Sequence, residues 1–535
     1  MTPAMGSERD GRPQSLAIAV GGALIAAVCV VAVNAPVLGR SVWADEAMLF
    51  SNYPLASIGH ALRPLPFYDQ AATPAYSIAV SWLADASIPV ARGASLGMIA
   101  FLIALTTTIA NRTWLAALVS TLCLTAFLEP LIIFSELKHY GLEAAGVVLS
   151  TLWFEYKDSR TRFAFGDAAL LVCAMLLGIS TLITACVALG LFFAVRLALR
   201  VPVKAGELAL GAAVLAASVG YYLLIRHITQ FQIANYTDAY SHVIGPVNVS
   251  VMVDAVMGVV GRQGLALSGL AIVAMAMTRN DPRSQRLLLI VAVTAVAFLF
   301  VSFLSLYPAT NSRHMNWTAA LFVAVLFAGM YRGLCLSGTA RLAAVVVAVA
   351  VLGATARTSV HLWRDSFEVT ANSQAISFLR AQAASAVGLW VAAQPVLDYY
   401  ERLEPEIGKH SYFGRLNRTS AVTVAPSLAR TMTAEQYNSI RDLPGAWGRT
   451  LMLRASMDYA APAAALVAEA PRDAPFFVLA SHYDLQARGG YPQARVAALE
   501  GAFAAASCDV DIVQRLRRVV VYRASCPQQP GGGDE

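Results

Sequence analysis

The sequence predicts a polytopic α-helical membrane protein of about eleven transmembrane helices, followed by a C-terminal α/β domain. Of its 535 residues, 57% are hydrophobic and 13% are charged, whereas a soluble domain has about 25% charged residues. Long apolar stretches alternate with basic connections as far as Thr358, and beyond it charged residues become frequent and apolar runs shorten to strand length. The net charge of +6 therefore indicates cytoplasmic loops rather than a nucleic-acid site.

Residues 1–14 form a polar tail ahead of the first apolar stretch, Ser15–Val37. This stretch is longer than the roughly 20 residues that cross a hydrocarbon core. A cleavable signal peptide is the alternative, but its apolar core is only about 7–15 residues long and precedes an Ala-x-Ala-like site. Here the flank reads Asn34-Ala35-Pro36-Val37. We therefore expect a retained signal anchor with its N-terminus in the cytoplasm.

Ten further apolar stretches complete a predicted membrane domain over residues 15–357. They are approximately Gly93–Ala110, Trp114–Phe134, Gly141–Phe154, Phe163–Leu182, Ile183–Leu199, Leu208–Ile225, Ala255–Thr278, Leu287–Leu306, Trp317–Met330 and Leu342–Ala356. Alternate connections collect basic residues, which is the positive-inside pattern of cytoplasmic loops. These residues are Arg112, Lys157, Arg160, Arg162, Arg196, Arg200, Lys204, Arg279, Arg283, Arg286, Arg332 and Arg341. The remaining connections hold acidic and aromatic residues and are predicted to face outward.

Residues 39–92 are predicted to form the first external loop. Within it, Thr73–Ala86 is apolar enough to suggest a helix, but it is short, begins at Pro74 and ends with Asp85. Counting it as a span would invert every later loop and place the basic connections outside. We therefore expect one or two amphipathic helices of this loop to lie at the membrane interface.

Residues 358–526 alternate short apolar runs with helical stretches, which predicts a small α/β domain. Its expected strands are Val387–Ala393, Phe476–Ala480 and Val519–Tyr522, and its expected helices include Gln374–Ala384 and Val496–Ala506. An odd number of spans and a cytoplasmic N-terminus place this domain in the periplasm. Residues 527–535 are expected to be a disordered tail.

Cys508 and Cys526 are the two cysteines of this C-terminal domain. An oxidising compartment allows them to form a disulfide, whereas two free buried thiols are the alternative. The sequence leaves both possibilities open.

Two acids, Asp45 and Glu46, follow the first apolar stretch within Trp43-Ala44-Asp45-Glu46-Ala47-Met48. They are expected where the chain first leaves the membrane, so they can act on a lipid-borne substrate. The alternative is that they cap the N-terminus of the following helix, a position that Asp favours. Capping and catalysis are compatible.

Two further motifs lie in predicted outer connections. The first begins at Glu129-Pro130 and continues through Ser135-Glu136-Leu137-Lys138-His139-Tyr140 to Glu143, and the second is Tyr307-Pro308 with Arg313-His314. Together with Asp45-Glu46-Ala47-Met48 and Tyr68-Asp69-Gln70, they resemble the polytopic glycosyltransferases of the C superfamily. The similarity is greatest to bacterial relatives of the protein mannosyltransferases and of lipid A aminoarabinose transferase. This sequence departs from that pattern where Glu129 and Glu143 replace aspartates and His139 replaces glutamine.

The resemblance implies an enzyme of the bacterial inner membrane with its active site facing the periplasm. It would move a sugar from a polyprenyl-phosphate donor to an envelope acceptor, which is a glycolipid, a polysaccharide or a protein. Its partners would be that lipid-linked sugar, membrane lipids and the acceptor, with no nucleic acid. Such a transfer needs a base for the acceptor hydroxyl, and general acid–base catalysis contributes about 10²–10⁴-fold in rate. Asp45 is the predicted base, with Glu46 as a supporting catalytic residue.

The departing lipid phosphate needs cationic partners, for which Lys138, Arg313 and His314 are the candidates, since arginine matches phosphate geometry well. Lys138 alone is also explained by snorkelling, and Arg313 by an ion pair with Asp69 or Glu136. The predicted substrate-binding residues are Asp69, Gln70, Glu136, Tyr140 and Glu143. Tyr140 can stack on a sugar, although an aromatic residue near the membrane surface is commonly an anchor.

We expect no cofactor. Glu136 and Glu143 are a possible pair of ligands for a divalent metal, which some members of the superfamily use, but no His/Asp spacing indicates one. The mannosyltransferase-like branch that this sequence resembles generally works without a metal.

A secondary transporter or lipid flippase is the main alternative function. Such proteins usually show internal repeats, broken helices or ionisable residues near the membrane midplane, whereas the polar motifs here gather at outer helix ends. A non-catalytic relative that binds glycolipid is the second alternative.

Overall fold

The computed structural model describes residues 16–50, 52, 61–63, 65, 72–83, 85–240, 249–277, 281–304, 306–307, 312–335, 338–365, 367–382, 385–391, 393–403, 410–415, 459–481, 483, 485 and 490–528. The chain divides into two compact units. Unit 1 comprises residues 1–38, 92–222 and 246–365, and unit 2 comprises residues 39–91, 223–245 and 366–535. Each unit is described separately.

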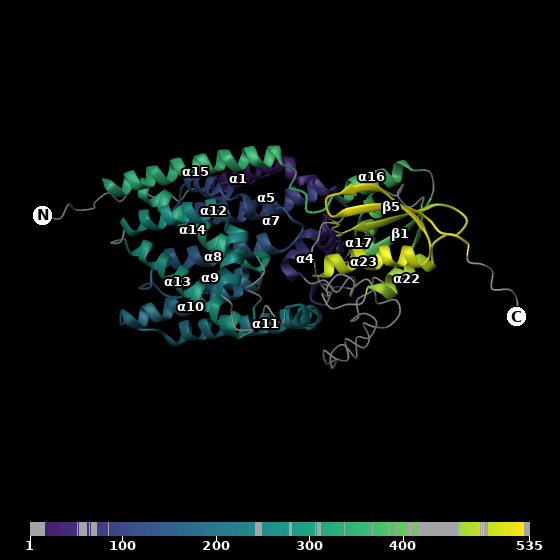
Figure 1. Cartoon of the computed structure of the whole chain (residues 1–535). Coiled ribbons are helices and arrows are strands. Elements are labelled where there is room, and N and C mark those ends of the chain that lie inside the picture. The colour runs from purple at the N-terminus through teal and green to yellow at the C-terminus, as the bar shows by residue number, and fades with distance from the viewer. Residues whose placement is uncertain are drawn as a thin grey trace. The chain divides into compact units, whose positions relative to one another are not determined.

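Unit 1 is a bundle of helices (Figure 1). Its elements are α1 (Leu16–Leu38), α5 (Ile88–Asn111), α6 (Leu115–Thr125), α7 (Leu128–Phe134), α8 (Tyr140–Tyr156), α9 (Phe165–Met175), α10 (Ile179–Ala198), α11 (Ala205–Tyr240), α12 (Val249–Met277), α13 (Pro282–Phe303), the 3₁₀ turn η2 (Ser312–Met315), α14 (Asn316–Cys335) and α15 (Thr339–Arg364). The first turn of α5 and the second half of α11, from Leu223, are assigned to unit 2. Helix α14 forms its centre, because it packs against α6, α8, α12 and α15.

In the described residues, eight helices are long and apolar enough to cross a membrane, and there are nine if the bent pair α6–α7 forms one span. The axes of α6 and α7 differ by 96°. Two of the eleven predicted spans correspond to shorter helices, α8 with 17 residues and α9 with 11. The count of eleven therefore stays a prediction.

The outer faces of these helices are apolar. Ile25 of α1 is 67% exposed, Phe300 of α13 is 61% exposed and Val349 of α15 is 63% exposed. A surface of this kind is unfavourable in water, where large exposed apolar patches normally mark a contact with another apolar phase. Together with the length of the helices, it identifies unit 1 as a membrane domain.

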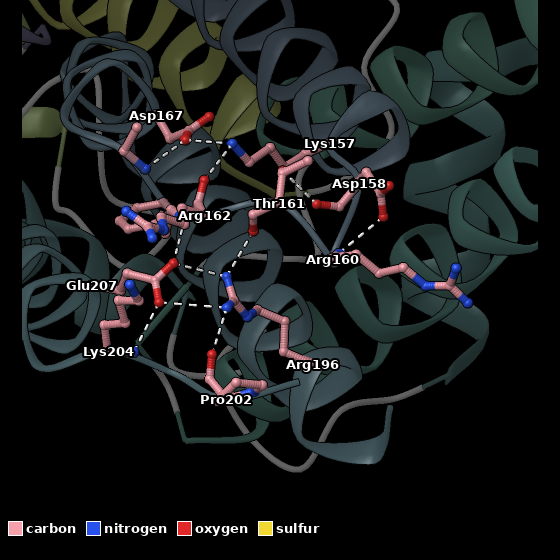
Figure 2. A network of polar contacts seen from close by, with 12 residues as sticks. Lys157, Asp158, Arg160, Thr161, Arg162, Asp167, Arg196, Pro202, Lys204 and Glu207 are labelled. Carbon is pink, nitrogen blue, oxygen red and sulfur yellow. Dashed lines mark hydrogen bonds and ion pairs between the residues drawn. The ribbon is translucent and has the colours of Figure 1, made fainter. Parts of the chain in front are cut away.

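One end of the bundle is held by a network around the buried Arg196, shown in Figure 2. Its guanidinium donates to the carbonyl oxygens of Thr161 (2.7 Å) and Pro202 (2.8 Å) and pairs with Glu207 at 2.9 Å. Glu207 also accepts from the backbone N–H groups of Phe163 and Lys204. This network joins the connection between α8 and α9 to the connection between α10 and α11.

A second cluster at the same end surrounds Arg332, near the end of α14. Arg332 pairs with the buried Glu155 of α8 and with Asp281 at 3.3 Å, just before α13. Arg286 of α13 donates to the backbone carbonyl of Lys157. The connections that the sequence predicts to be cytoplasmic therefore meet at one end of unit 1.

Unit 2 contains a five-stranded mixed sheet in the order β2-β1-β3-β5-β4. The strands are β1 (Ala386–Val391), β2 (Ser411–Phe413), β3 (Phe476–Ser481), β4 (Asp509–Leu516) and β5 (Val519–Ser525). β1 is parallel to β2 and β3, with Gly388 opposite Phe413 and Val478, whereas β5 is antiparallel to β3 and β4. The helices are α2 (Ala44–Phe50), α4 (Pro74–Ser81), α16 (Asn372–Ala381), α17 (Ala393–Leu403), α22 (Ala460–Ala468) and α23 (Gly490–Ala505).

The three strands expected from the sequence correspond to β1, β3 and β5, which have buried side chains. β4 was not predicted, since it is an exposed edge strand whose apolar residues alternate with charged ones and are interrupted by a bulge between Ile512 and Gln514. Cys508 and Cys526 form a disulfide, which joins the residue before β4 to the residue after β5. This resolves the alternative that the sequence left open.

Candidate active site

Asp45 lies in the first turn of α2, in unit 2. Every other residue of 41–50 is buried, and Asp45 alone in this segment is partly exposed. The segment therefore presents one carboxylate at its surface. This is the arrangement that a base acting on an external substrate requires.

The neighbouring Glu46 is fully buried. Its Oε2 accepts a hydrogen bond from the backbone N–H of Trp43 at 3.4 Å, and the carbonyl of Trp43 accepts from Ala47 at 3.0 Å. Trp43 is thus the N-cap of α2 and Glu46 its third helical residue, so the two make the backbone half of a capping box. This contact gives Glu46 a structural role.

Glu136 and Lys138 lie in unit 1, in the short connection between α7 and α8. Both side chains are buried, at 3% and 5% exposure. The connection is tight, because the N–H of Lys138 donates to the carbonyl of Glu136 at 2.8 Å. Glu136 and Lys138 are therefore not solvated surface groups, although charged residues are almost never fully buried unless they are paired.

His139, Tyr140 and His314 bring their rings together where α8 begins. The rings of His139 and Tyr140 are 4.8 Å apart, and Tyr140 meets His314 edge-on at 5.7 Å. Burial, together with the nearby Lys138 and His314, lowers the pKa of His139 to about 3. The His139 imidazole is therefore neutral near pH 7.

Glu143, one turn into α8, binds the N-terminus of α10. Its carboxylate accepts from the hydroxyl of Ser180 at 2.6 Å and from the backbone N–H groups of Ile179 and Ser180. A carboxylate at this place satisfies N–H groups that have no partner within the helix. Gly178, which precedes α10, makes room for it, because a Cβ there would lie 2.1 Å from Cγ of Glu143.

The same chain of contacts continues to the segment that carries His314. The hydroxyl of Ser180 is 2.9 Å from that of Tyr307, and Tyr307 donates to the backbone carbonyl of His314. Burial and the nearby Glu143 carboxylate raise the pKa of Tyr307 well above its ordinary value, so its hydroxyl stays protonated and can donate. Glu143, Ser180, Tyr307 and His314 thus form one connected group, which we call the outer polar chain.

The structure brings together five of the predicted residues within unit 1, namely Glu136, Lys138, Tyr140, Glu143 and His314. Asp45 and Glu46 belong to unit 2. Asp69 and Gln70 lie outside the described residues, and of Arg313 only the backbone in η2 is described. In the part of the chain that is described, no three His, Cys, Asp or Glu side chains form a group suited to a metal ion.

Gly178 and Ser180 were not among the predicted site residues. The apolar run through this region is continuous, and the boundary between two spans was placed at residues 182 and 183, whereas α9 ends at Met175 and α10 begins at Ile179. Glycine is a helix-end signal, so Gly178 within the apolar run could have placed the boundary before Ile179.

No protein-family model matches the sequence, and a search of curated proteins found no match. Among solved structures, the chain is similar to ArnT from Cupriavidus metallidurans. With the crystal structure bound to undecaprenyl phosphate it shares 14% identity and a TM-score of 0.44, over 93% of this chain and 97% of ArnT. With the apo structure it shares 13% identity and a TM-score of 0.43, over 94% of this chain and 97% of ArnT.

Proposed function

We propose that this protein is a membrane glycosyltransferase that moves a sugar from a polyprenyl-phosphate donor to an envelope acceptor on the periplasmic face of the inner membrane. The observation that carries the proposal is the partly exposed Asp45 in an otherwise buried segment that directly follows the membrane helix α1. The outer polar chain and the buried Lys138 support it. Undecaprenyl phosphate, which one of the ArnT structures contains, belongs to the proposed class of lipid carrier, but the proposal depends on the residues of this chain.

The depth of the outer polar chain fits a lipid-linked donor. Ser180 and Arg196 lie on the same helix, about 24 Å apart at a rise of about 1.5 Å per residue. If the Arg196 network lies at the cytoplasmic headgroups, the outer polar chain lies near the opposite edge of a hydrocarbon core about 30 Å thick. A polyprenyl phosphate places its phosphate at that level.

In the proposed reaction the acceptor hydroxyl attacks the anomeric carbon of the sugar and gives its proton to Asp45. The new bond joins the anomeric carbon to the acceptor oxygen. The bond from that carbon to the phosphate oxygen breaks, and polyprenyl phosphate leaves with the electron pair. The sequence motifs assign the positive charge for the leaving phosphate to Lys138 and Arg313, and sugar binding to Tyr140.

Asp45→Asn tests the proposal. We expect the variant to insert and fold like the parent but to lose at least about 10²-fold in transfer rate, because the amide cannot accept the proton. The purified chain is incubated with a panel of polyprenyl-phosphate sugars and envelope acceptors, and release of polyprenyl phosphate is measured.

Asp85→Asn is the matched control, because it neutralises an exposed carboxylate of the same external loop. We expect it to be fully active. Normal turnover by Asp45→Asn would exclude Asp45 as the base.

One observation favours a second candidate, a lipid flippase or transporter, since broken helices are common in such proteins. α12 is interrupted at Gly261, where φ is +69°, and Gln263 donates to the carbonyl of Ala126 at the break between α6 and α7. Glu129 lies against the same break, because a Cβ on Gly261 would be 2.5 Å from its Oε2. Movement of lipid into vesicles without release of polyprenyl phosphate would favour this alternative.

A further inference from the structure

The strand order in the sheet of unit 2 reverses next to β1, and open α/β folds bind their ligands at such a reversal. β2 and β3 flank β1 on opposite sides and run parallel to it. In such folds the ligand lies outside the carboxyl ends of the strands, at the point where the strand order reverses. Here that point lies between the ends of β1 and β3, at Val391 and Ser481.

The end of β3 is connected to the backbone of Val42, three residues before Asp45. The hydroxyl of Ser481 donates to Oδ1 of Asn372 at 2.7 Å, and Nδ2 of Asn372 donates to the carbonyl of Val42 at 2.8 Å. Asn372 also donates to Oγ1 of Thr370 at 2.8 Å. Asn372 and Ser481 are fully buried, so the amide is held in one orientation and all its hydrogen-bonding groups are used.

The helix that follows β1 holds the same segment. The N–H of Val42 donates to the hydroxyl of Tyr400 of α17 at 3.4 Å, and the ring of Tyr399 meets Phe50 of α2 edge-on at 5.3 Å. α17 packs along α2. Both backbone polar groups of Val42 are therefore bound by side chains of the C-terminal domain.

A third contact joins the residue before Val42 to α16. The hydroxyls of Ser41 and Ser373 are 2.6 Å apart, and the backbone N–H of Ser373 donates to Ser41 at 3.1 Å. The segment 41–50 is thus held along its length.

We propose that the C-terminal α/β domain is a positioning domain for Asp45, and that Asn372, Ser481 and Tyr400 are its positioning residues. In similar open α/β folds this edge holds a ligand, whereas here it holds the chain's own segment 41–50 and leaves Asp45 partly exposed. The role in catalysis depends on the proposed function, whereas the attachment of the segment to the domain does not.

Asn372→Ala and Ser481→Ala in the full-length chain test this inference. Asn372→Ala removes the bond to Val42, and Ser481→Ala removes the hydroxyl that orients Asn372. Tyr522→Phe is the control, because it deletes a buried hydroxyl of the same domain whose hydrogen bonds go to Tyr483 at 3.1 Å and to Glu500 at 3.4 Å. Hydrogen exchange of the peptide 41–50 is followed by mass spectrometry, together with kcat and the KM for the donor.

We expect exchange of the peptide 41–50 to rise roughly tenfold in both alanine variants, because a buried hydrogen bond is lost. Exchange in β3 and β5 stays unchanged. We expect kcat to fall up to about 10²-fold at an unchanged KM for the donor, since a misplaced base slows the chemical step. Tyr522→Phe changes neither quantity.

Unchanged exchange of segment 41–50 in both alanine variants would overturn the inference. So would an equal loss of kcat in Tyr522→Phe, because the effect would then be general destabilisation of the domain. If the parent protein releases no polyprenyl phosphate from any donor, the proposed function fails, while the exchange data still decide whether the domain holds α2.

Discussion

At the scale of single residues, the outer polar chain depends on Gly178, which has no side chain and so leaves space for Glu143. Gly178→Ala would place a methyl group 2.1 Å from Cγ of Glu143, and the backbone at Gly178 is extended, so the obstacle is space rather than backbone strain. We expect Glu143 to be displaced from the N-terminus of α10. The cost is about 1–3 kcal/mol, as for other overpacked sites, and is measured as a lower unfolding temperature in detergent.

Gly190→Ala is the matched control in the same helix. A Cβ at Gly190 meets nothing within 4 Å, and alanine is favoured over glycine in a helix interior by roughly 0.5–1 kcal/mol. We expect this variant to be as stable as the parent or slightly more stable. Equal destabilisation of both variants would show that Glu143 does not need the space at Gly178.

The sequence placed Glu136, Lys138, Tyr140, Glu143 and His314 at one end of the membrane helices, and the structure groups them there. The sequence allowed this prediction because the order of the motifs and the alternation of charged connections follow the path of the chain through the membrane. The contacts of Asn372 with Val42 could not be predicted in this way, because the two residues are 330 positions apart. No periodicity in either segment specifies such a partner.

At the scale of helices, Arg196 holds the ends of α8, α9, α10 and α11 together, and it has three different acceptors (Figure 2). We expect Arg196→Met to destabilise the protein by about 3–5 kcal/mol, because it leaves the carboxylate of Glu207 buried without its cation. Thermal unfolding in detergent measures the loss. Arg196→Lys should recover only part of it, since a single ammonium does not reproduce the planar fork of the guanidinium.

Arg160→Ala is the control for this cluster. Its side chain is exposed and points away from Arg196 in Figure 2. Arg160→Ala removes a positive charge at this end of the bundle but leaves the buried Arg196–Glu207 pair in place. We therefore expect it to change the stability by less than about 0.5 kcal/mol. If Arg160→Ala and Arg196→Met were equally unstable, the effect would come from the net charge of the loops and not from the network.

At the scale of the whole molecule, the number of membrane crossings decides on which side the C-terminal domain lies. Within the described part of the chain, the eight long helices together with the bent pair α6–α7 give nine crossings, and adding α8 and α9 gives the predicted eleven. Both numbers are odd, so both place the two termini on opposite sides. The C-terminal domain lies on the other side if α6 and α7 form a re-entrant loop that does not cross the membrane while α8 and α9 both cross. The number of crossings is then ten, which places both termini on the same side.

Two observations favour the odd count. The basic connections meet at one end of unit 1, which the positive-inside rule assigns to the cytoplasm, and the Cys508–Cys526 disulfide is typical of an oxidising compartment such as the periplasm. We therefore expect alkaline phosphatase fused after Cys526 to be active in bacterial cells and green fluorescent protein fused at the same position to be dark. A fusion after Arg341, in a basic connection, should give the reverse pattern. A fluorescent fusion after Cys526 would place the C-terminal domain and Asp45, which it holds, in the cytoplasm, where the proposed transfer to an envelope acceptor cannot occur.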